Sequence, residues 1–343
     1  MRSAITELFA VARSGRFTPY AQGVSVKLPT GDALTIKIEK VSKSLRPPGL
    51  RFSAFAFMTE VSAGGFQGVG FGEAPTRLIA LQKSIAEGVE RVLYKALKGT
   101  AFGSANSNGW AAHLSYEQAL SAALDELVER DAVLVHWLGQ IPMKEIAPAS
   151  WPRRLTRWTQ DELRLSPIFN QLRILISARG YKPTVTTVLG DHDGYAVLSH
   201  ATAASLGQAL DKALSETCRI AQIAMEQPQA VASSNIASPE DHALFYAFHE
   251  RLPTWLFGDP IGWSAANSQW RAHEKQFCMP ALEPKFHQIA SGPLVVGFAT
   301  SDQIQSLYFG RTEDAQEKGL INVRRMRVIK PEMDFYLEPH CVP

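Results

Sequence analysis

The first part of the chain alternates between apolar and polar residues in short runs that predict strands. Val24–Leu28 and Leu34–Glu39 are two such runs, and the turn-forming residues 29–32 (Pro-Thr-Gly-Asp) separate them, so we predict a β-hairpin. Residues 52–61 predict a further strand. A run of glycines at 64, 65, 68, 70 and 72 follows, and we interpret it as a flexible connection.

From Thr76 onward the spacing of the apolar positions becomes helical. The stretch Thr76–Leu97 is predicted to be a helix, because its apolar residues form one stripe. The members of that stripe are Ile85, Val89, Val92, Leu93 and Ala96. Further helices are predicted over Ser115–Trp137, Ser205–Met225 and Pro239–Arg251, the last with Ser238 as its N-cap and proline in its first turn.

The second half of the chain also contains runs that predict strands. These runs are Leu172–Ile176, Thr184–Leu189, Leu294–Phe298 and Val323–Ile329. Residues 140–171 are rich in proline and tryptophan and give no clear assignment. Because strands and long helices alternate without regular βαβ spacing, we predict an α/β fold of the mixed α+β type.

Composition narrows the class of protein. The chain has 343 residues, 45% of them hydrophobic, which is enough to bury a core without disulfides or metal ions. The net charge is +2, which argues against a broad phosphate-binding surface for nucleic acid. Three widely spaced cysteines (Cys218, Cys278 and Cys341) argue against a disulfide framework and a cysteine zinc site.

The sequence gives no indication of a targeting or membrane-spanning segment. Residues 1–10 lack a sustained apolar core, so we expect a structural segment there and no signal peptide. No run of 18 apolar residues occurs, and we expect no membrane span. A cytoplasmic protein is the working hypothesis.

Two of the predicted helices carry the same short motif, E-x-V-E-R. It stands at residues 87–91 and again at residues 126–130. At about 100° per residue, Ser84, Glu87, Glu90 and Arg91 fall within one arc of roughly 120° on the first helix. The third long helix has Lys212, Glu216 and Arg219 at i, i+4 and i+7. Three helices therefore each present carboxylates together with a cation on one face.

Two interpretations of these faces remain open at this point. In the first, they are ordinary solvated faces, since pairs such as Glu87 with Arg91 stabilise an exposed helix by about 0.3–0.5 kcal/mol. In the second, they form a binding site. Several carboxylates without cysteine or histidine suit Mg²⁺, and Mg²⁺ with arginine and lysine is what a triphosphate requires. No P-loop motif occurs, and the spacing of Gly68, Gly70 and Gly72 does not match a dinucleotide fingerprint.

At these residues the chain resembles the YcaO family of ATP-dependent peptide-modifying enzymes. The family motif SxxExxER corresponds to residues 84–91, and a second motif, E-x-x-E-R-D after Asn-Gly, corresponds to residues 126–131 after Asn108 and Gly109. The third family helix, A-L-x-R-A-L-x-E, corresponds to residues 209–216. Asp241-His242 with Tyr246, and the region up to Pro331, are also similar, so the resemblance spans residues 68–331.

The resemblance implies a YcaO-like fold, with long helices packed on β-sheets and ATP between helices. It implies a β-rich N-terminal segment (1–62), a catalytic domain (63–335) and a C-terminal tail (336–343). The cofactors would be ATP and Mg²⁺. The implied metal ligands are Glu87, Glu90, Glu126, Glu129 and Glu216. The implied nucleotide contacts are Ser84, Arg91, Arg130 and Lys212.

The resemblance also implies a reaction. ATP would phosphorylate the oxygen of a backbone amide in a ribosomally synthesised precursor peptide, and a neighbouring nucleophile would then displace phosphate. A cysteine, serine or threonine side chain gives an azoline by cyclodehydration; sulfide or an amine would give a thioamide or an amidine. Precursor peptide and a partner protein that recognises it are the expected partners, nucleic acid and membrane are not, and a homodimer is compatible with the sequence.

Three positions and the C-terminal tail depart from the family pattern. Lys212 replaces an arginine, Arg219 stands where many members have glutamine, and Gln118 stands where an acidic residue is sometimes found. Residues 337–343 lack the PxPxP tail of many azoline-forming members, so the resemblance leaves the catalytic base unassigned. The departures keep a non-catalytic scaffold with the same fold open as an alternative function.

Other polar residues have simpler interpretations. Residues 191–193 (Asp-His-Asp) have the composition of a metal site but lie between Gly190 and Gly194, which favours a turn. His113 could take part in proton transfer, although a capping or packing role is favoured. Cys218 is interpreted as a core thiol. The tryptophans at 151, 158, 255, 263 and 270 indicate either packing or a peptide groove.

Overall fold

The computed structural model describes residues 24–100, 107–177, 182–227, 236, 238–274, 283–292, 294–329 and 334–340. The expectations for residues 1–10, Cys278 and Cys341 therefore lie outside the described residues. The chain forms two compact units. Unit 1 comprises the described parts of Met1–Leu45, Ser53–Glu126 and Pro284–Thr300, and unit 2 those of Arg46–Phe52, Leu127–Glu283 and Ser301–Pro343. The predicted bounds at 62 and 335 stay a prediction.

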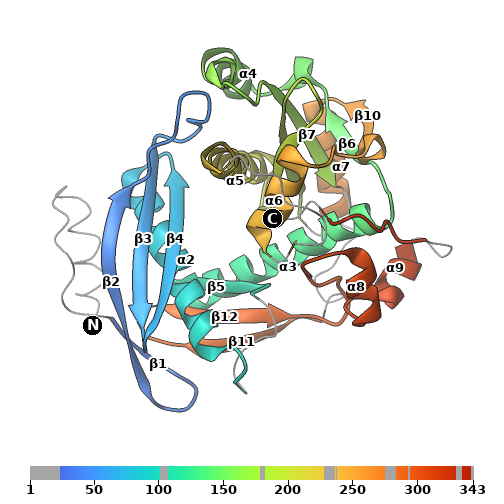
Figure 1. Cartoon of the computed structure of the whole chain (residues 1–343). Helices are drawn as coiled ribbons and strands as arrows, with labels where there is room; N and C mark the ends of the chain where they lie inside the picture. The colour runs from blue at the N-terminus through green and yellow to red at the C-terminus, as the bar shows by residue number, and fades with distance from the viewer. Residues whose placement is uncertain are drawn as a thin grey trace. The chain divides into compact units, whose positions relative to one another are not determined.

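Unit 1 contains a four-stranded antiparallel sheet with the order β1-β2-β3-β4 (Figure 1). Its strands are β1 (Val24–Lys27), β2 (Ala33–Lys43), β3 (Phe55–Ala63) and β4 (Phe66–Ala74). The predicted hairpin is confirmed, and Gly31 in its turn has φ +90°, a conformation that favours glycine. The long helix α2 (Arg77–Leu97) packs against β3 and β4.

A second, three-stranded antiparallel sheet also belongs to unit 1. Its order is β11-β12-β5, formed by Lys285–Ala290, Val295–Thr300 and Trp110–His113. Trp110 stacks on Phe298 with ring centroids 5.3 Å apart. Buried residues of both sheets and of α2 form one hydrophobic core. Sequence-distant segments therefore place β5 against α2, which matters for the site.

Three glycines of the predicted flexible connection lie in a strand instead, and only Gly64 and Gly65 form a turn, between β3 and β4. Gly68, Gly70 and Gly72 lie in β4 and face α2. A Cβ on Gly70 would lie 2.0 Å from the Ser84 carbonyl oxygen, and one on Gly72 would lie 1.9 Å from that of Ala80. The glycines are needed because the backbones of helix and strand approach too closely for any side chain.

Helix α3 (Tyr116–Leu138) belongs to both units, which divide between Glu126 and Leu127. Unit 2 contains a five-stranded sheet with the order β10-β6-β7-β8-β9, in which β10 and β6 are parallel and the other pairs antiparallel. The strands are β6 (Met143–Ile146), β7 (Gln171–Ser177), β8 (Thr184–Gly190), β9 (Ala196–Thr202) and β10 (Phe257–Ile261). The helices of the same region are α4 (Arg153–Asp161), α5 (Leu206–Glu226), α6 (Pro239–Phe248) and α7 (Trp263–Glu274).

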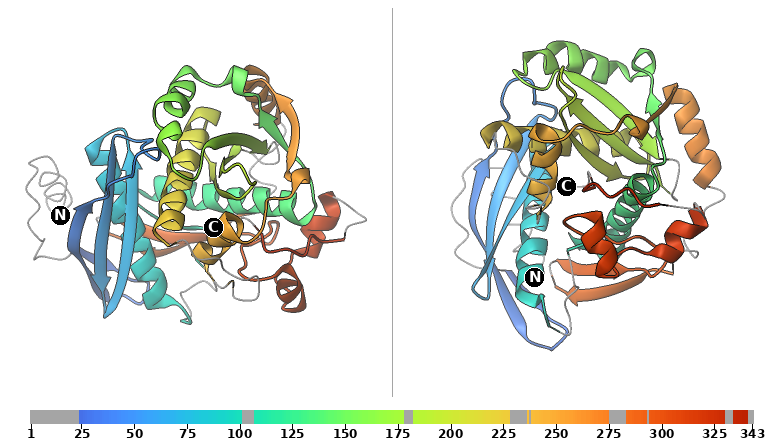
Figure 2. Two further views of the ribbon diagram at one scale, coloured as in Figure 1. Left: turned by 45° about the horizontal axis from the view of Figure 1, so that its top comes forward. Right: turned by 45° about the vertical axis from the view of Figure 1, so that its right-hand side comes forward.

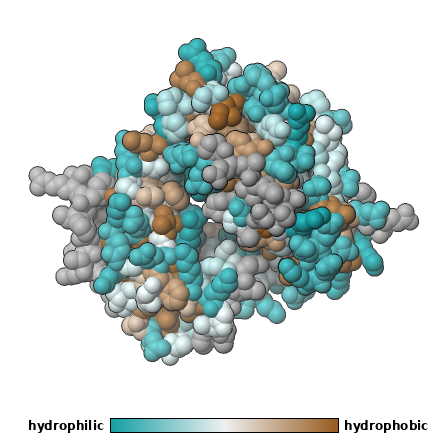
Figure 3. Space-filling view, in the orientation of Figure 1, coloured by the Kyte–Doolittle hydropathy of each residue, from teal (hydrophilic) through white to brown (hydrophobic). Residues whose placement is uncertain are grey.

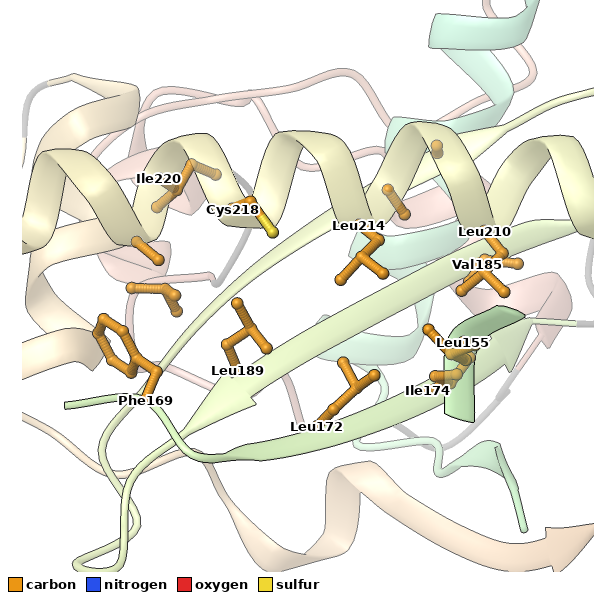
Figure 4. Packing of buried hydrophobic residues seen from close by; sticks show 14 of the residues in the cluster. Leu155, Phe169, Leu172, Ile174, Val185, Leu189, Leu210, Leu214, Cys218 and Ile220 are labelled. Atoms are coloured by element: carbon orange, nitrogen blue, oxygen red, sulfur yellow. The ribbon is translucent and has the colours of Figure 1, made fainter. Parts of the chain in front are cut away.

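Helix α5 lies along one face of this sheet, as both views in Figure 2 show. Its apolar stripe contacts the strands side chain to side chain: Leu210, Leu214 and Cys218 point toward Val185 and Leu189 (Figure 4). Cys218 is fully buried, which confirms the predicted core thiol. The packing of α5 is an ordinary interdigitated apolar core.

The predicted strand near the end of the chain is the second prediction that the structure contradicts. Residues Val323–Ile329 form a helix, α9, and not a strand. The Asn322 side chain caps its start by accepting the backbone N–H of Arg325 at 3.0 Å, and Met326 is fully buried. Arg325 also pairs with the buried Asp131 of α3 at 2.7 Å. The local cap, together with the tertiary contacts of Arg325 and Met326, outweighs the strand propensity of the valine and isoleucine residues.

The short helix α8 (Thr312–Glu317) precedes α9, and hydrophilic side chains cover its surface in the view of Figure 3. Within the described ranges, no helix combines the length and apolar character needed to cross a membrane. The mixed α/β fold predicted from the sequence is confirmed by these sheets and helices.

Candidate functional site

Four polar side chains, at four-residue spacing on α2, bind the outer edge of strand β4. The pairs are Lys83 with Glu73, Glu87 with Phe71, Arg91 with Val69 and Lys95 with Gln67, all through backbone atoms of the strand. Four helical residues advance about 6 Å and two strand residues about 6.6 Å, so the two spacings match. This ladder closes the edge of the sheet, and it also occupies two of the predicted site residues, Glu87 and Arg91.

Both carboxylate oxygens of Glu87 have partners. Oε2 accepts the backbone N–H of Phe71 at 2.6 Å, and Oε1 lies 2.6 Å from the Arg91 guanidinium. The hydroxyl of Ser84, one turn earlier, is fully buried, donates to the Leu81 carbonyl at 2.9 Å and lies 2.7 Å from Thr59 Oγ1. These three predicted site residues therefore hold α2 on its sheet.

Glu90 is in a different situation. Its Oε1 accepts the backbone N–H of Ala112 in β5 at 2.6 Å, and the structure gives Oε2 no hydrogen-bond partner among the described residues. Burial raises the pKa of Glu90 well above its usual value, the Ala112 hydrogen bond lowers it, and the carboxylates of Glu126 and Glu87 raise it further. A cation at this carboxylate would relieve the cost of its charge.

In unit 2, Glu129 repeats the arrangement of Glu90. Its Oε2 accepts the backbone N–H of Thr202, the last residue of β9, at 2.9 Å, and no described residue binds Oε1. The carbonyl of the same Thr202 accepts from Lys212 Nζ at 3.0 Å. Burial raises the pKa of Glu129, while Arg130 and Lys212 lower it. The end of β9 therefore holds one carboxylate and one ammonium group close together.

Glu216, the last predicted metal ligand, is bound by its own helix. Arg219 Nε lies 3.0 Å from each of the two carboxylate oxygens, and Arg219 NH2 also donates to Oε1. The side chain of Arg219 is largely buried, at 14% exposure, and that of Glu216 is 40% exposed. A planar guanidinium matches a carboxylate in this forked manner, so the charge of Glu216 is already compensated.

The C-terminal segment 334–340 is held in unit 2 by side chains that bind its backbone carbonyls. Trp137 and Thr312 donate to Glu338, Tyr246 donates to Pro339 at 2.5 Å, and His242 Nδ1 donates to His340 at 2.6 Å. The rings of His242 and His340 stack with centroids 4.1 Å apart. The departure from PxPxP therefore does not leave this segment unattached.

Both histidines of the stack are held neutral. Burial lowers the pKa of His242 to about 4, and burial with the neighbouring His242 lowers that of His340 well below its usual value. Arg130 contributes to the lowered pKa of His340, so the segment reaches the electrostatic range of a predicted nucleotide contact. Sequence analysis missed His340, since neither spacing nor motif distinguishes it.

The remaining candidates have structural roles. Asp191 Oδ1 accepts the backbone N–H groups of Asp193 and Tyr195, so residues 191–193 form the predicted turn, which connects β8 to β9. His113 ends β5, and burial lowers its pKa. Trp158 donates to the Arg51 carbonyl and Trp151 to that of Ile146, which supports the packing interpretation.

The donor set fits Mg²⁺ with ATP. Across the described ranges, no group of three or more histidine, cysteine, aspartate or glutamate side chains could hold a metal ion by itself. Mg²⁺ with a nucleotide does not need such a group, because it takes one or two carboxylates and completes its coordination with phosphates and water. Glu90 and Glu129 each have one oxygen available for this purpose, while Arg130 and Lys212 supply positive charge.

Comparison with known proteins identifies the family. The profile described as "YcaO cyclodehydratase, ATP- and Mg²⁺-binding" matches residues 89–282, which is more than half of the chain. The match includes Glu90, Arg91, Lys212 and both glutamates of the second motif, and it begins after Ser84 and Glu87. No match was found among the sequences of curated proteins.

Solved structures show the same fold at low sequence identity. YcaO from Methanopyrus kandleri bound with AMPPCP and Mg²⁺ has a TM-score of 0.52 at 14% identity, over 77% of this chain and 85% of that one. A heterocyclase in complex with substrate and cofactor has a TM-score of 0.56 at 13% identity, over 88% of this chain and 54% of that one. The chain thus matches only about half of the heterocyclase.

A third structure with this fold is the E. coli microcin synthetase McbBCD complex with pro-MccB17 bound. Its TM-score is 0.50 at 12% identity, and the match covers 82% of this chain and 91% of that one. At such identities these likenesses show the fold, and the family profile carries the assignment. The chain belongs to the YcaO cyclodehydratase family and is an ATP-dependent enzyme whose cofactors are ATP and Mg²⁺.

Proposed function

We propose that this enzyme uses ATP and Mg²⁺ to activate a backbone amide in a ribosomally synthesised precursor peptide, and that the product is an azoline. One observation carries the proposal: Glu90 and Glu129, the second glutamates of the repeated motif, are each held by one backbone N–H and keep one oxygen for a cation. A glutamate in an ordinary surface ion pair stays solvated, whereas burial raises the pKa values of Glu90 and Glu129.

We assign the proposed metal ligands and the proposed phosphate contacts to different residues. Glu90 and Glu129 are the proposed Mg²⁺ ligands, with Glu126 contributing negative charge beside Glu90. Arg130 and Lys212 are the proposed phosphate contacts, because both lie close enough to Glu129 to lower its pKa. When bound, ATP supplies the phosphoryl group that activates the amide oxygen, and Mg²⁺ neutralises the triphosphate.

Ser84, Glu87 and Arg91 serve the proposed site indirectly. The Ser84 hydroxyl lies 2.7 Å from Thr59 Oγ1 in β3, and the side chains of Glu87 and Arg91 bind backbone atoms of β4. Through these contacts they set the rotation of α2 about its axis and so the direction in which Glu90 projects. A catalytic group needs such support, because a small misplacement of the site costs binding and rate.

The proposed substrate and partner draw on the solved relatives. A heterocyclase has been solved with its substrate, and the McbBCD complex has been solved with pro-MccB17, so a peptide substrate and a partner protein are reasonable for this chain. Thioamide or amidine formation by the same amide activation is the alternative, since the tail lacks PxPxP. Mass spectrometry of a modified peptide distinguishes them: cyclodehydration removes one water, whereas thioamidation exchanges oxygen for sulfur.

Calorimetry with AMPPCP tests the nucleotide part of the proposal. The full chain should bind AMPPCP with Mg²⁺ and lose that binding when EDTA removes the metal. Glu90→Gln and Glu129→Gln should each weaken binding by at least about tenfold, or about 1.4 kcal/mol. Glu117→Gln, which changes an exposed glutamate on the same helix as Glu129, is the matched control. Unchanged affinity in both site variants would overturn the assignment.

A further inference from the structure

The forked ion pair of Glu216 and Arg219 is the feature on which this inference rests. Both oxygens of Glu216 lie 3.0 Å from Arg219 Nε, and NH2 of the same guanidinium donates to Oε1. The two residues are at positions i and i+3 of α5, so the backbone of one helix sets the geometry of the pair. The arginine side chain is more buried than the glutamate, at 14% against 40% exposure.

The charges around this pair show what a metal ion would meet. Unit 2 contains four of the predicted site residues, and Arg219 lies beside one of them. Together they are three cations (Arg130, Lys212 and Arg219) and two carboxylates (Glu129 and Glu216). Glu129 interacts electrostatically with Arg130, Lys212 and Glu216, so these residues lie near one another. A divalent cation at Glu216 would have to displace the guanidinium or lie beside it. Displacement would break the ion pair and leave the largely buried guanidinium without Glu216, and a position beside the guanidinium would bring two positive charges close together.

Unit 1 has the opposite balance. Glu87, Glu90 and Glu126 lie within electrostatic range of one another, with Arg91 as the cation that accompanies them. Here an added cation would meet an excess of negative charge. The family resemblance implies the same role for all five glutamates, but the contacts of Glu216 distinguish it from Glu90 and Glu129.

We propose that Arg219 takes the place of a Mg²⁺ ion at Glu216, so that Glu216 is a charge-paired positioning residue and not a metal ligand. The nucleotide then binds with fewer metal ions than the five predicted glutamates imply. This inference rests on the proposed function. It concerns the number of bound metal ions and not whether nucleotide binds.

Counting bound Mn²⁺ in the presence of AMPPCP tests the proposal. Electron paramagnetic resonance measures free Mn²⁺, and hence the number of ions bound per protein with saturating nucleotide. Glu216→Gln should leave this number unchanged, whereas Glu90→Gln and Glu129→Gln should reduce it. A lower number of bound ions in Glu216→Gln, comparable to that in Glu129→Gln, would overturn the inference.

The arginine variants give the complementary result. Arg219→Gln removes the guanidinium and should allow one more Mn²⁺ ion to bind, or raise Mn²⁺ affinity by about tenfold or more. The gain should be lost in the double variant Arg219→Gln/Glu216→Gln. Arg154→Gln is the matched control, because Arg154 pairs with Asp211 on α5 at 2.5 Å and lies outside the proposed site.

The outcomes separate the two proposals. If the wild type binds AMPPCP only with metal, but Arg219→Gln binds the same number of ions with the same affinity, the inference fails and the proposed function stands. If the wild type binds no AMPPCP at any Mn²⁺ concentration, the proposed function fails and the inference with it. Circular dichroism melting establishes that each variant is folded before it is titrated.

Discussion

Helices α2 and α5 both carry predicted site residues, and each packs on the sheet of its own unit in a different way. α2 lies against β4 backbone to backbone, with Gly68, Gly70 and Gly72 at the contact. α5 packs on β8 through leucine and cysteine side chains, with no such close approach (Figure 4). The first contact tolerates almost no added atoms, and the second is an apolar core whose volume matters.

The two helices also use their charged residues differently. On α2, Lys83, Glu87, Arg91 and Lys95 bind the backbone of β4, so most of the polar stripe is structural. On α5, Lys212 binds the end of β9, and Glu216 binds Arg219 within the helix itself. Charged residues that form similar stripes on two helices therefore do not have equal roles. Each carboxylate must be judged by the partners of its two oxygens.

The largest expected effect concerns the glycine contact of unit 1. Gly70→Ala would place a Cβ 2.0 Å from the Ser84 carbonyl oxygen and 2.3 Å from Gly88 N, so α2 would have to move. We expect a loss of about 3 kcal/mol or more in the free energy of unfolding. Gly190→Ala in unit 2 is the control, since its Cβ would meet no atom closer than 3.6 Å. Urea denaturation measures both, and equal stabilities would contradict the close-contact account.

The next prediction compares two lysines that make the same type of hydrogen bond. Lys83 donates to the Glu73 carbonyl at 3.1 Å in unit 1, and Lys212 donates to the Thr202 carbonyl at 3.0 Å in unit 2. Lys212→Met should weaken AMPPCP binding by about tenfold or more, because it also removes a proposed phosphate contact. Lys83→Met should change stability only. Calorimetry with Mg²⁺ compares them, and equal nucleotide affinities would remove the distinction between the two helices.

A pH dependence is expected for Glu90. Its pKa is raised mainly by burial, so the folded protein binds a proton more readily than the unfolded chain, and stability falls as pH rises through the raised pKa. Glu90→Gln, without nucleotide or metal, should therefore be more stable than wild type at pH 8. The difference should shrink as pH falls toward the ordinary glutamate pKa of about 4.3. Thermal melts across this range check the sign, and a difference that grows on acidification would contradict it.

The smallest effect is expected at the C-terminal segment. Tyr246→Phe removes a buried hydrogen bond, in which the Tyr246 hydroxyl lies 2.5 Å from the Pro339 carbonyl oxygen. The expected loss is about 1 kcal/mol in the free energy of unfolding. Tyr94→Phe in unit 1 is the control, because no described residue accepts a hydrogen bond from that hydroxyl. Urea denaturation of the two variants tests whether the carbonyl contacts hold the segment.

Helices α2, α3, α5 and α6 were predictable because their signals are local. Thr76, Ser205 and Ser238 cap α2, α5 and α6 by accepting backbone N–H groups of the first turn, and Ser238 forms a full capping box with Asp241. Their positions agree with the predicted boundaries within a few residues. An apolar stripe and a capping side chain are read from neighbouring residues, and no distant contact is required.

The wrong predictions both depended on distant contacts. Glycines at alternate positions are typical of a loop unless a helix backbone lies against them, and here α2 does. Residues Val323–Ile329 have strand propensity, but Asp131 in α3 binds Arg325 from almost two hundred residues away and adds to the local cap by Asn322. Strand β9 was missed, although its end holds both Glu129 and Lys212.

The sequence alone determined the family, the long helices and the faces on which the glutamates stand, because these follow from local spacing and short motifs. Only the tertiary structure decided which carboxylate oxygens are already occupied. Glu87 and Glu216 are bound by arginines, whereas Glu90 and Glu129 are each anchored by one backbone N–H. The physical reason is that a carboxylate's readiness to bind a metal depends on its partners and burial, and those come from residues distant in the sequence.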